Sequence, residues 1–148
     1  MGVKIKVKIE EITTVDNAFS EGVARLVPQL SQRASAPSSE RLERIAANPS
    51  SHMLAAVAED GTIAGITTLI ITEIPTSCKA WTEDVVVDEK YRGQGIGRAL
   101  VTRAVEMARE CGAEQIMLTS NPSRTAARKL YAECGFSEVE TTLFRLFL

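Results

Sequence analysis

The sequence is poor in the residues that build metal centres and catalytic triads. It contains one histidine, His52, and three cysteines, Cys78, Cys111 and Cys134, with no CxxC spacing. We therefore expect reduced cysteines and no metal site, and a Ser/His/Asp or Cys/His triad would depend on His52 alone. For the cysteines we favour the interpretation of small buried apolar side chains.

Long apolar runs and a strong charge excess are also missing. No stretch approaches the ~20 apolar residues that cross a bilayer, and the segment Met1–Glu11 alternates Lys with Val and Ile instead of forming a signal-peptide core. The 17 Lys and Arg residues nearly balance the 19 Asp and Glu residues, whereas nucleic-acid affinity rests on neutralising many phosphates. We expect a cytoplasmic protein without a membrane or nucleic-acid partner.

What the sequence does contain is an ordinary globular composition. Hydrophobic residues make up 45% of its 148 residues, enough for a two-layer core that needs neither disulfides nor metal. We therefore expect residues 1–148 to form a single domain.

Hydrophobic periodicity predicts strands and helices in the first half of the chain. The expected strands are Val3–Ile9, His52–Glu59 and Thr62–Thr72, and the expected helices are Val15–Leu30 and Glu40–Ala47. Asp16 is placed to cap the first helix. Asp60 and Gly61 form a strong turn signal, so the second and third strands should make an antiparallel hairpin.

The second half continues with strands and crossover helices, which together predict one α/β domain with a mixed α+β sheet. The expected strands are Lys79–Val87, Glu114–Thr119 and Thr141–Leu148, and the expected helices are Gly95–Cys111 and Ser123–Cys134. The apolar run Val85–Val87 is typical of a strand covered on both faces. The apolar last strand would pair with a second chain if it lies at a sheet edge, which predicts a homodimer.

A glycine-rich loop joins the strand that ends at Val87 to the following helix. Its sequence, DEKYRGQGIGR, has glycines at positions 93, 95 and 97. Glycine lets backbone N–H groups turn toward a ligand, and the first helical turn adds a partial positive charge, so the loop predicts a phosphate site. Its spacing fits neither the Walker loop nor the dinucleotide motif.

The run EDVVVDEKYRGQGIGRALV (Glu83–Val101) resembles the acetyl-CoA-binding motif of the GNAT family of N-acetyltransferases, whose signature is [Q/R]xxGx[G/A]. The segment AARKLYAECGF (Ala126–Phe136) resembles the family's second motif. The first fifteen residues of the first run are also similar to glucosamine-6-phosphate N-acetyltransferases. Thr119 stands where those enzymes tend to have an acid, so their substrate is not carried over.

The resemblance implies the acyl-CoA N-acyltransferase fold, in which a largely antiparallel central sheet is flanked by helices. Its fourth and fifth strands splay apart and admit the pantetheine arm of acetyl-CoA. By position, backbone groups of Val85 and Val87 would bond pantetheine, and N–H groups of Val86 and Val87 would stabilise the developing oxyanion. The residues expected to hold the pyrophosphate are Arg92, Gly93, Gln94, Gly95, Ile96, Gly97 and Arg98.

Three further residues belong to the expected cofactor site. Arg124 and Arg128 would add positive charge beside the anionic cofactor. Arg124 stands where the family commonly has Asn, which puts one pantetheine contact in doubt. Asn121 either replaces that Asn or caps the following helix.

Acetyl transfer to an amine requires that a proton leave the nitrogen. An amine with a pKa of about 10.4 is about three units from its neutral form at pH 7, a penalty of about 4–5 kcal/mol. Glu83 is the expected base, because Asp84 would face the other side of the strand unless the strand bulges. The resemblance implies Tyr131 as the acid that protonates the leaving thiolate. The alternatives are a solvent-facing strand acid for Glu83 and a core tyrosine for Tyr131.

These residues favour an enzyme that moves an acetyl group from acetyl-CoA directly to a primary amine of a small molecule or peptide, with no metal and no covalent enzyme intermediate. The acceptor would enter between the first helix, the loop 31–39 and the end of the hairpin. One alternative is a noncatalytic acyl-CoA-binding sensor or interaction module. Another is an ATP-dependent transferase, for which the sequence lacks recognisable metal-binding acids.

Overall fold

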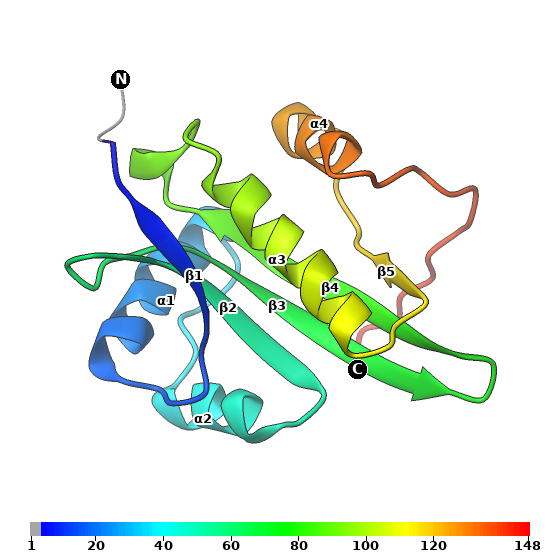
Figure 1. Cartoon of the computed structure of the whole chain (residues 1–148), viewed down its shortest axis with the longest axis horizontal. Coiled ribbons are helices and arrows are strands. Elements are labelled where there is room, and N and C mark those ends of the chain that lie inside the picture. Colours follow the sequence, from blue (N-terminus) through cyan, green and yellow to red (C-terminus); the bar gives the residue numbers. More distant parts are fainter. Residues whose placement is uncertain (1–3) are drawn as a thin grey trace.

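One five-stranded sheet organises the protein in the computed structural model, which describes residues 4–148 (Figure 1). Its strands are β1 (Val7–Glu11), β2 (Ser51–Ala58), β3 (Ile63–Ile74), β4 (Ser77–Val87) and β5 (Gln115–Met117), and they lie side by side in chain order. Strands β1 to β4 pair antiparallel, and β5 pairs parallel to β4. The mixed, largely antiparallel sheet and the β2–β3 hairpin are therefore confirmed.

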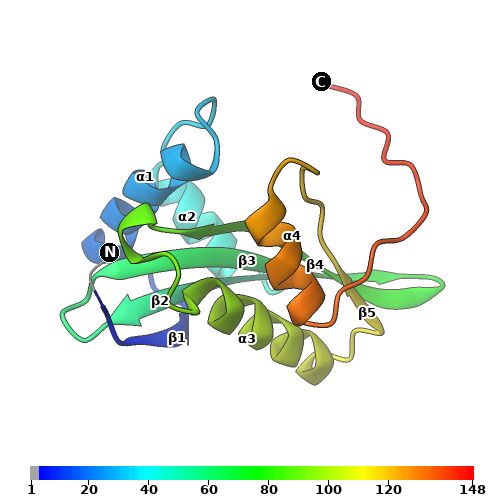
Figure 2. The same cartoon turned by 90° about the horizontal axis from the view of Figure 1, so that it is seen from above.

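Helices cover both faces of this sheet. They are α1 (Asn17–Leu30), α2 (Ser39–Ala47), α3 (Ile96–Glu110) and α4 (Thr125–Glu133), with a short 3-10 turn, η1 (Glu89–Tyr91). Figure 2 shows α1 and α2 on one side of the sheet and α3 on the other. Asp16 caps α1 as predicted, because its carboxylate accepts the N–H of Phe19 at 2.8 Å.

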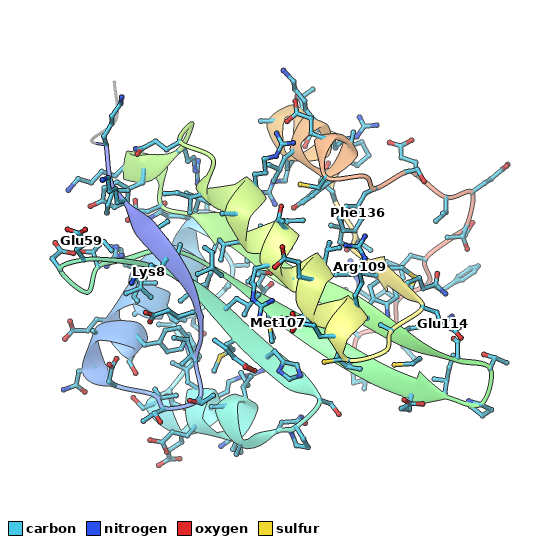
Figure 3. The ribbon with its side chains drawn as sticks, in the orientation of Figure 1. Lys8, Glu59, Met107, Arg109, Glu114 and Phe136 are labelled. Carbon is cyan, nitrogen blue, oxygen red and sulfur yellow. The ribbon has the colours of Figure 1, made fainter. Side chains whose placement is uncertain are left out.

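Each face of the sheet has its own apolar core. The cluster under α1 and α2 comprises Phe19, Val23, Leu26, Leu42, Met53, Ala55, Ile63 and Val86. The cluster under α3 includes Leu54, Leu69, Ala80, Ile96, Leu100, Ala104 and Met107, the last labelled in Figure 3. Val86 belongs to the first cluster and Val87 packs against the second. The end of β4 is thus covered on both faces, as its apolar run predicts.

Three expectations about element ends and burial are wrong. The first strand begins at Val7 instead of Val3, which lies outside the described residues, because β2 offers partners only opposite Val7–Glu11. The fourth helix begins two residues later than expected, at Thr125. Cys111 caps the exposed end of α3 and is solvent-exposed, although Cys78 and Cys134 are half-buried; all three thiols are free.

The predicted strand Thr141–Leu148 is also wrong, because the structure assigns no strand there. Apolar residues form a strand only where a sheet edge supplies hydrogen-bond partners, and within one chain this segment reaches no edge. It leaves α4 and extends away from the sheet, toward the side that carries α1 and α2 (Figure 2). Across residues 4–148, no helix has the length and apolar character needed to span a membrane.

Candidate active site

The site is a cleft beside the end of β4, beyond the residues at which β4 pairs with β5. The two strands pair only where Lys79–Trp81 meets Gln115–Met117, and β4 then continues alone to Val87. The resulting cleft has a volume of about 610 Å³. It is lined by Val85, Val86, Val87, Tyr91, Arg92, Gly93, Gly95, Ile96, Gly97, Arg98, Arg124, Thr125, Ala126, Ala127, Leu130 and Tyr131.

A β-bulge in β4 shapes the rim of this cleft. Ile66 pairs with Val86 and Thr68 pairs with Glu83, so two residues, Asp84 and Val85, lie opposite Thr67. Asp84 has a φ of 54°, in the left-handed region that aspartate tolerates better than most residues. The bulge interrupts the strict alternation of side chains along β4 at Asp84 and Val85.

Two buried threonines hold the bulge. The Thr67 hydroxyl donates to the Glu83 carbonyl oxygen at 2.9 Å. Its oxygen lies 2.7 Å from the Thr82 hydroxyl, which donates to it because the single proton of Thr67 is already used. Thr67 and Thr82 are 1% and 2% exposed, so these bonds satisfy polar groups that water does not reach. Nothing in the sequence alone signals this pair.

Glu83 is not among the residues that line the cleft; it lies two positions before Val85, the first lining residue of β4, and it is exposed. Partial burial, and then the negative charge of Asp84, raise the pKa of the Glu83 carboxyl. A raised pKa makes a carboxylate a stronger proton acceptor, which suits a general base.

The glycine loop presents free backbone donors to the cleft. Gly93 and Gly95 have φ values of 79° and 80°, and a Cβ at either position would meet no atom within 4 Å. Within residues 4–148, no acceptor is bonded to the N–H groups of Gly93, Gly95, Ile96, Gly97 and Arg98, and the first helical bond is donated by Ala99. Backbone donors at the start of a helix are a typical binding site for an anion such as a phosphate group.

Two other residues of the loop serve the protein's own backbone. The Arg92 guanidinium Nε donates to the Val87 carbonyl oxygen at 3.0 Å. That oxygen retains a second lone pair for another donor. The side-chain oxygen of Gln94 accepts the Ile5 N–H at 2.9 Å, and Gln94 does not line the cleft.

A buried clamp that the sequence analysis missed anchors the entrance to this loop. Asp88, 6% exposed, follows β4 directly and accepts hydrogen bonds from Arg25 Nε at 3.0 Å and from the Lys90 N–H at 3.1 Å. From the same helix as Arg25, Gln29 accepts the Glu89 N–H at 2.8 Å. Burial alone would raise the pKa of Asp88, but these hydrogen bonds outweigh it and lower that pKa. The one signal in the sequence that could have pointed to Asp88 is its position, directly after a strand and before a turn.

Tyr131 belongs both to the core and to the cleft. Its ring packs edge-on against Phe136, labelled in Figure 3 near the end of α4, with centroids 6.1 Å apart at 62°. Tyr131 is only 8% exposed, yet it lines the cleft. It is therefore a core tyrosine that also reaches the cleft. Burial raises the pKa of the Tyr131 phenol, against the opposing charge of Arg124.

The remaining sequence-derived candidates divide into those inside and those outside the cleft. Arg98 and Arg124 line it. Arg128 does not, because its guanidinium bonds the Glu138 carboxylate and the Pro122 carbonyl oxygen. Asn121 accepts the Ser123 N–H at 3.0 Å and does not cap α4, whose N-cap is Arg124.

His52 and the thiols take no part in the cleft. His52 Nδ1 lies 2.6 Å from a carboxylate oxygen of Glu11 on β1. In the described part of the chain, no three or more His, Cys, Asp or Glu side chains cluster in a way that could hold a metal ion.

Comparison with known proteins agrees with this geometry. The model of the acetyltransferase (GNAT) family matches residues 18–136. Solved structures of similar shape include a putative acetyltransferase from Agrobacterium tumefaciens (24% identity, TM-score 0.82, 95% of this chain and 99% of that chain) and a protein described as a transcriptional regulator from Bacillus halodurans (27%, 0.83, 95% and 99%). The first of these shows the fold alone. This protein belongs to the GNAT acetyltransferase family.

The sequence matches to curated relatives cover shorter parts of the chain. A probable glucosamine 6-phosphate N-acetyltransferase from Oryza sativa is 46% identical over 56 residues, which are 38% of this chain and 32% of that protein. Streptothricin acetyltransferase from Streptomyces lavendulae is 34% identical over 92 residues, 59% of this chain and 45% of that protein. These matches span less than half of the relatives' own length.

Proposed function

We propose that this protein transfers the acetyl group of acetyl-CoA directly to a primary amine. The observation that carries the proposal is the set of N–H groups of Gly93, Gly95, Ile96, Gly97 and Arg98, which bond no acceptor among residues 4–148 and whose residues line the cleft beside β4 and α4. The family membership supports the choice of an acyl-CoA co-substrate over a nucleotide.

In this proposal the backbone does most of the binding. The pyrophosphate bonds the N–H groups at the start of α3, where Arg98 and Arg124 add positive charge. The pantetheine arm follows the unpaired edge of β4, at Val85 and Val87, as an added strand would. The Val87 carbonyl takes a pantetheine N–H with the lone pair that Arg92 leaves open.

The transfer itself needs one proton acceptor and one proton donor. The amine nitrogen forms the new C–N bond to the acetyl carbon while the C–S bond to CoA breaks. Glu83 receives the proton that the nitrogen gives up, directly or through a water molecule, and Tyr131 protonates the departing sulfur. The acceptor is a primary amine of a small molecule or peptide, approaching from the side of α1 and the loop 31–39.

Binding is tested with two glycine variants of equal backbone strain. Gly95→Ala puts a Cβ on left-handed backbone of the glycine loop, and Gly61→Ala does the same in the β2–β3 turn, where a Cβ also meets nothing within 4 Å. Each should lose about 1–2 kcal/mol of stability. We expect CoA to raise the melting temperatures of the wild type and of Gly61→Ala. The melting temperature of Gly95→Ala should rise much less. Equal stabilisation of all three, or stabilisation by ATP as well, would contradict the proposal.

Turnover is tested by measuring thiol release from acetyl-CoA across a panel of primary amines. Glu83→Gln and Tyr131→Phe should each lower kcat by about 10²–10⁴-fold while CoA binding is retained. Saturable acetyl-CoA binding with no turnover on any amine would point instead to a noncatalytic acyl-CoA-binding module.

A further inference from the structure

Part of the sheet face that carries α1 and α2 extends beyond both helices. The core under these helices reaches Ile63, Ile66 and Val86. Ile70 and Trp81 lie farther along the β3–β4 hairpin; they are half-buried, and in the described part of the chain they pack against neither core cluster. In Figure 2, α1 and α2 lie over the end of the sheet that carries the β2–β3 turn, and the β3–β4 hairpin continues past them. Large apolar side chains are therefore partly open on this face.

Strand register places Trp81 between two other apolar side chains. Ile70 of β3 pairs with Trp81 on one side, and Met117 of β5 pairs with it on the other. Side chains of directly paired residues lie beside each other on the same face of a sheet. Met117 is half-buried as well. These three residues form an apolar surface across three neighbouring strands, which we call the Trp81 wall.

The Trp81 wall lies on the same face of the sheet as the proposed base. Ala80 is buried in the core under α3, so the alternation of side chains along β4 sends Trp81 to the opposite face. Glu83 follows Trp81 by two residues and pairs with Thr68 in regular register, before the bulge. Two residues of a strand span about 6.6–6.8 Å. The Trp81 side chain is therefore the neighbour of Glu83 along this face.

The other neighbour of Trp81 along β4 is a cation. Lys79 precedes Trp81 by two residues, shares its face and is half-buried. Glu83 attracts the positive charge of an amine, Trp81 offers apolar surface, and Lys79 repels a second positive charge. This order fits an amine with an apolar group near its nitrogen, and it does not fit a polyamine.

We propose that the acceptor is a primary amine with an aromatic or other large apolar group, and that the Trp81 wall binds this group. The inference rests on the acetyl transfer proposed above and names the acceptor class of that site. With the nitrogen at Glu83, the step of about 6.6–6.8 Å to Trp81 allows roughly two or three atoms between nitrogen and ring. An aromatic group gains ring contact with Trp81 in addition to the burial of its apolar surface.

Binding is tested through the fluorescence of Trp81, which is the only tryptophan of the chain and reports directly on the wall. The full chain, saturated with CoA, is titrated with 2-phenylethylamine, ethylamine and putrescine. We expect a saturable change of the emission with 2-phenylethylamine, and none with the other two amines at the same concentrations. Equal responses to the three amines, or no response to any of them, would overturn the proposal.

Turnover, measured by thiol release, separates this proposal from the proposed function. The value of kcat/KM for 2-phenylethylamine should exceed that for ethylamine by about 10- to 100-fold. Acetylation of ethylamine or putrescine at least as fast as that of 2-phenylethylamine would overturn the acceptor class and leave the proposed acetyl transfer standing. Saturable binding of 2-phenylethylamine without turnover of any amine would support the wall and contradict the acetyl transfer.

Two neighbouring isoleucines provide a matched pair of variants. Ile70 belongs to the wall, whereas Ile71 is half-buried on the opposite face, against the core under α3. In the fluorescence titration, Ile70→Ala should raise the Kd for 2-phenylethylamine by about 3- to 10-fold, and Ile71→Ala should leave it unchanged. Both variants should still bind CoA. Equal Kd values in the two variants would overturn the proposal.

Substitution of Trp81 itself gives a kinetic readout. Trp81→Ala should raise the KM for 2-phenylethylamine by about 10-fold or more, while kcat/KM for ethylamine stays the same. Trp81→Phe, which keeps an aromatic ring, should restore most of the loss. A KM that Trp81→Ala leaves unchanged would overturn the proposal. If Trp81→Ala does not fold, the isoleucine pair decides.

Discussion

At the scale of single residues, the adjacent acids of the bulge are the chemically distinctive feature. Glu83 carries a raised pKa, caused by partial burial and by the charge of Asp84. Asp84 occupies left-handed backbone, a conformation that asparagine also tolerates. Asp84→Asn therefore removes the charge and keeps the shape of the bulge.

This substitution gives a pH prediction for the proposed base. A base must be deprotonated to act, so kcat/KM should rise with pH through the pKa of Glu83. Removing the like charge in Asp84→Asn lowers that pKa, so the acid limb should move to lower pH. Rates measured from pH 4 upward with one fixed amine check this. In Glu83→Gln the limb assigned to Glu83 should vanish, and an unmoved limb in Asp84→Asn would count against the assignment.

At the scale of secondary-structure elements, α1 packs closely against β3, on the face of the sheet opposite α3. Gly22 is buried in α1, and a Cβ there would lie 2.6 Å from the Cβ of Ile63. Both atoms are close to the backbone and cannot rotate away. The helix must therefore shift to admit any side chain at this position.

Gly22→Ala should consequently destabilise the protein by about 1–3 kcal/mol, the usual cost of overpacking. Helix propensity alone would predict a gain of about 1 kcal/mol. Ala24→Gly, at an exposed position of the same helix, measures that propensity term with the opposite sign. Urea unfolding of the two variants separates the effects, and a more stable Gly22→Ala would contradict the packing argument.

At the scale of the whole molecule, Asp88 links the two faces of the sheet. Through Arg25 and Gln29 it ties α1 to the turn that leads into the glycine loop. Burial would raise the pKa of Asp88, but hydrogen bonds from the Lys90 N–H, Arg25 and Gln29 together lower it in the folded protein. The folded state therefore binds fewer protons than the unfolded chain over the range between the two pKa values.

The contribution of Asp88 to stability is complete above the ordinary aspartate pKa, about 3.9, and is lost as pH falls through the lower folded-state pKa. Asp88→Asn should cost about 1–3 kcal/mol at pH 7, and the difference from wild type should shrink below about pH 4. Denaturant unfolding across pH 3–7 measures it; a difference independent of pH would show that the charge is not responsible.

Much of this architecture could be predicted from the sequence because it depends on local patterns. The α1 cap at Asp16, the Asp60-Gly61 hairpin and the glycine-to-helix junction each rest on residues a few positions apart. The acetyltransferase motif rests on the same kind of local pattern. The Thr67–Thr82 pair and the Arg25–Asp88 clamp could not be predicted, since each joins strands or helices that are distant in sequence.

The sequence by itself determined the helices α1 to α4 and the strands β1 to β5, and it determined the glycine loop at the start of α3, because hydrophobic period, capping residues and glycine act within one or two turns of chain. Only the tertiary structure decided where β4 and β5 part, that Asp84 lies in a bulge, that Arg128 faces Glu138, and that the apolar residues after Val139 find no edge in their own chain. These depend on which distant backbone groups meet, and a linear pattern does not encode that.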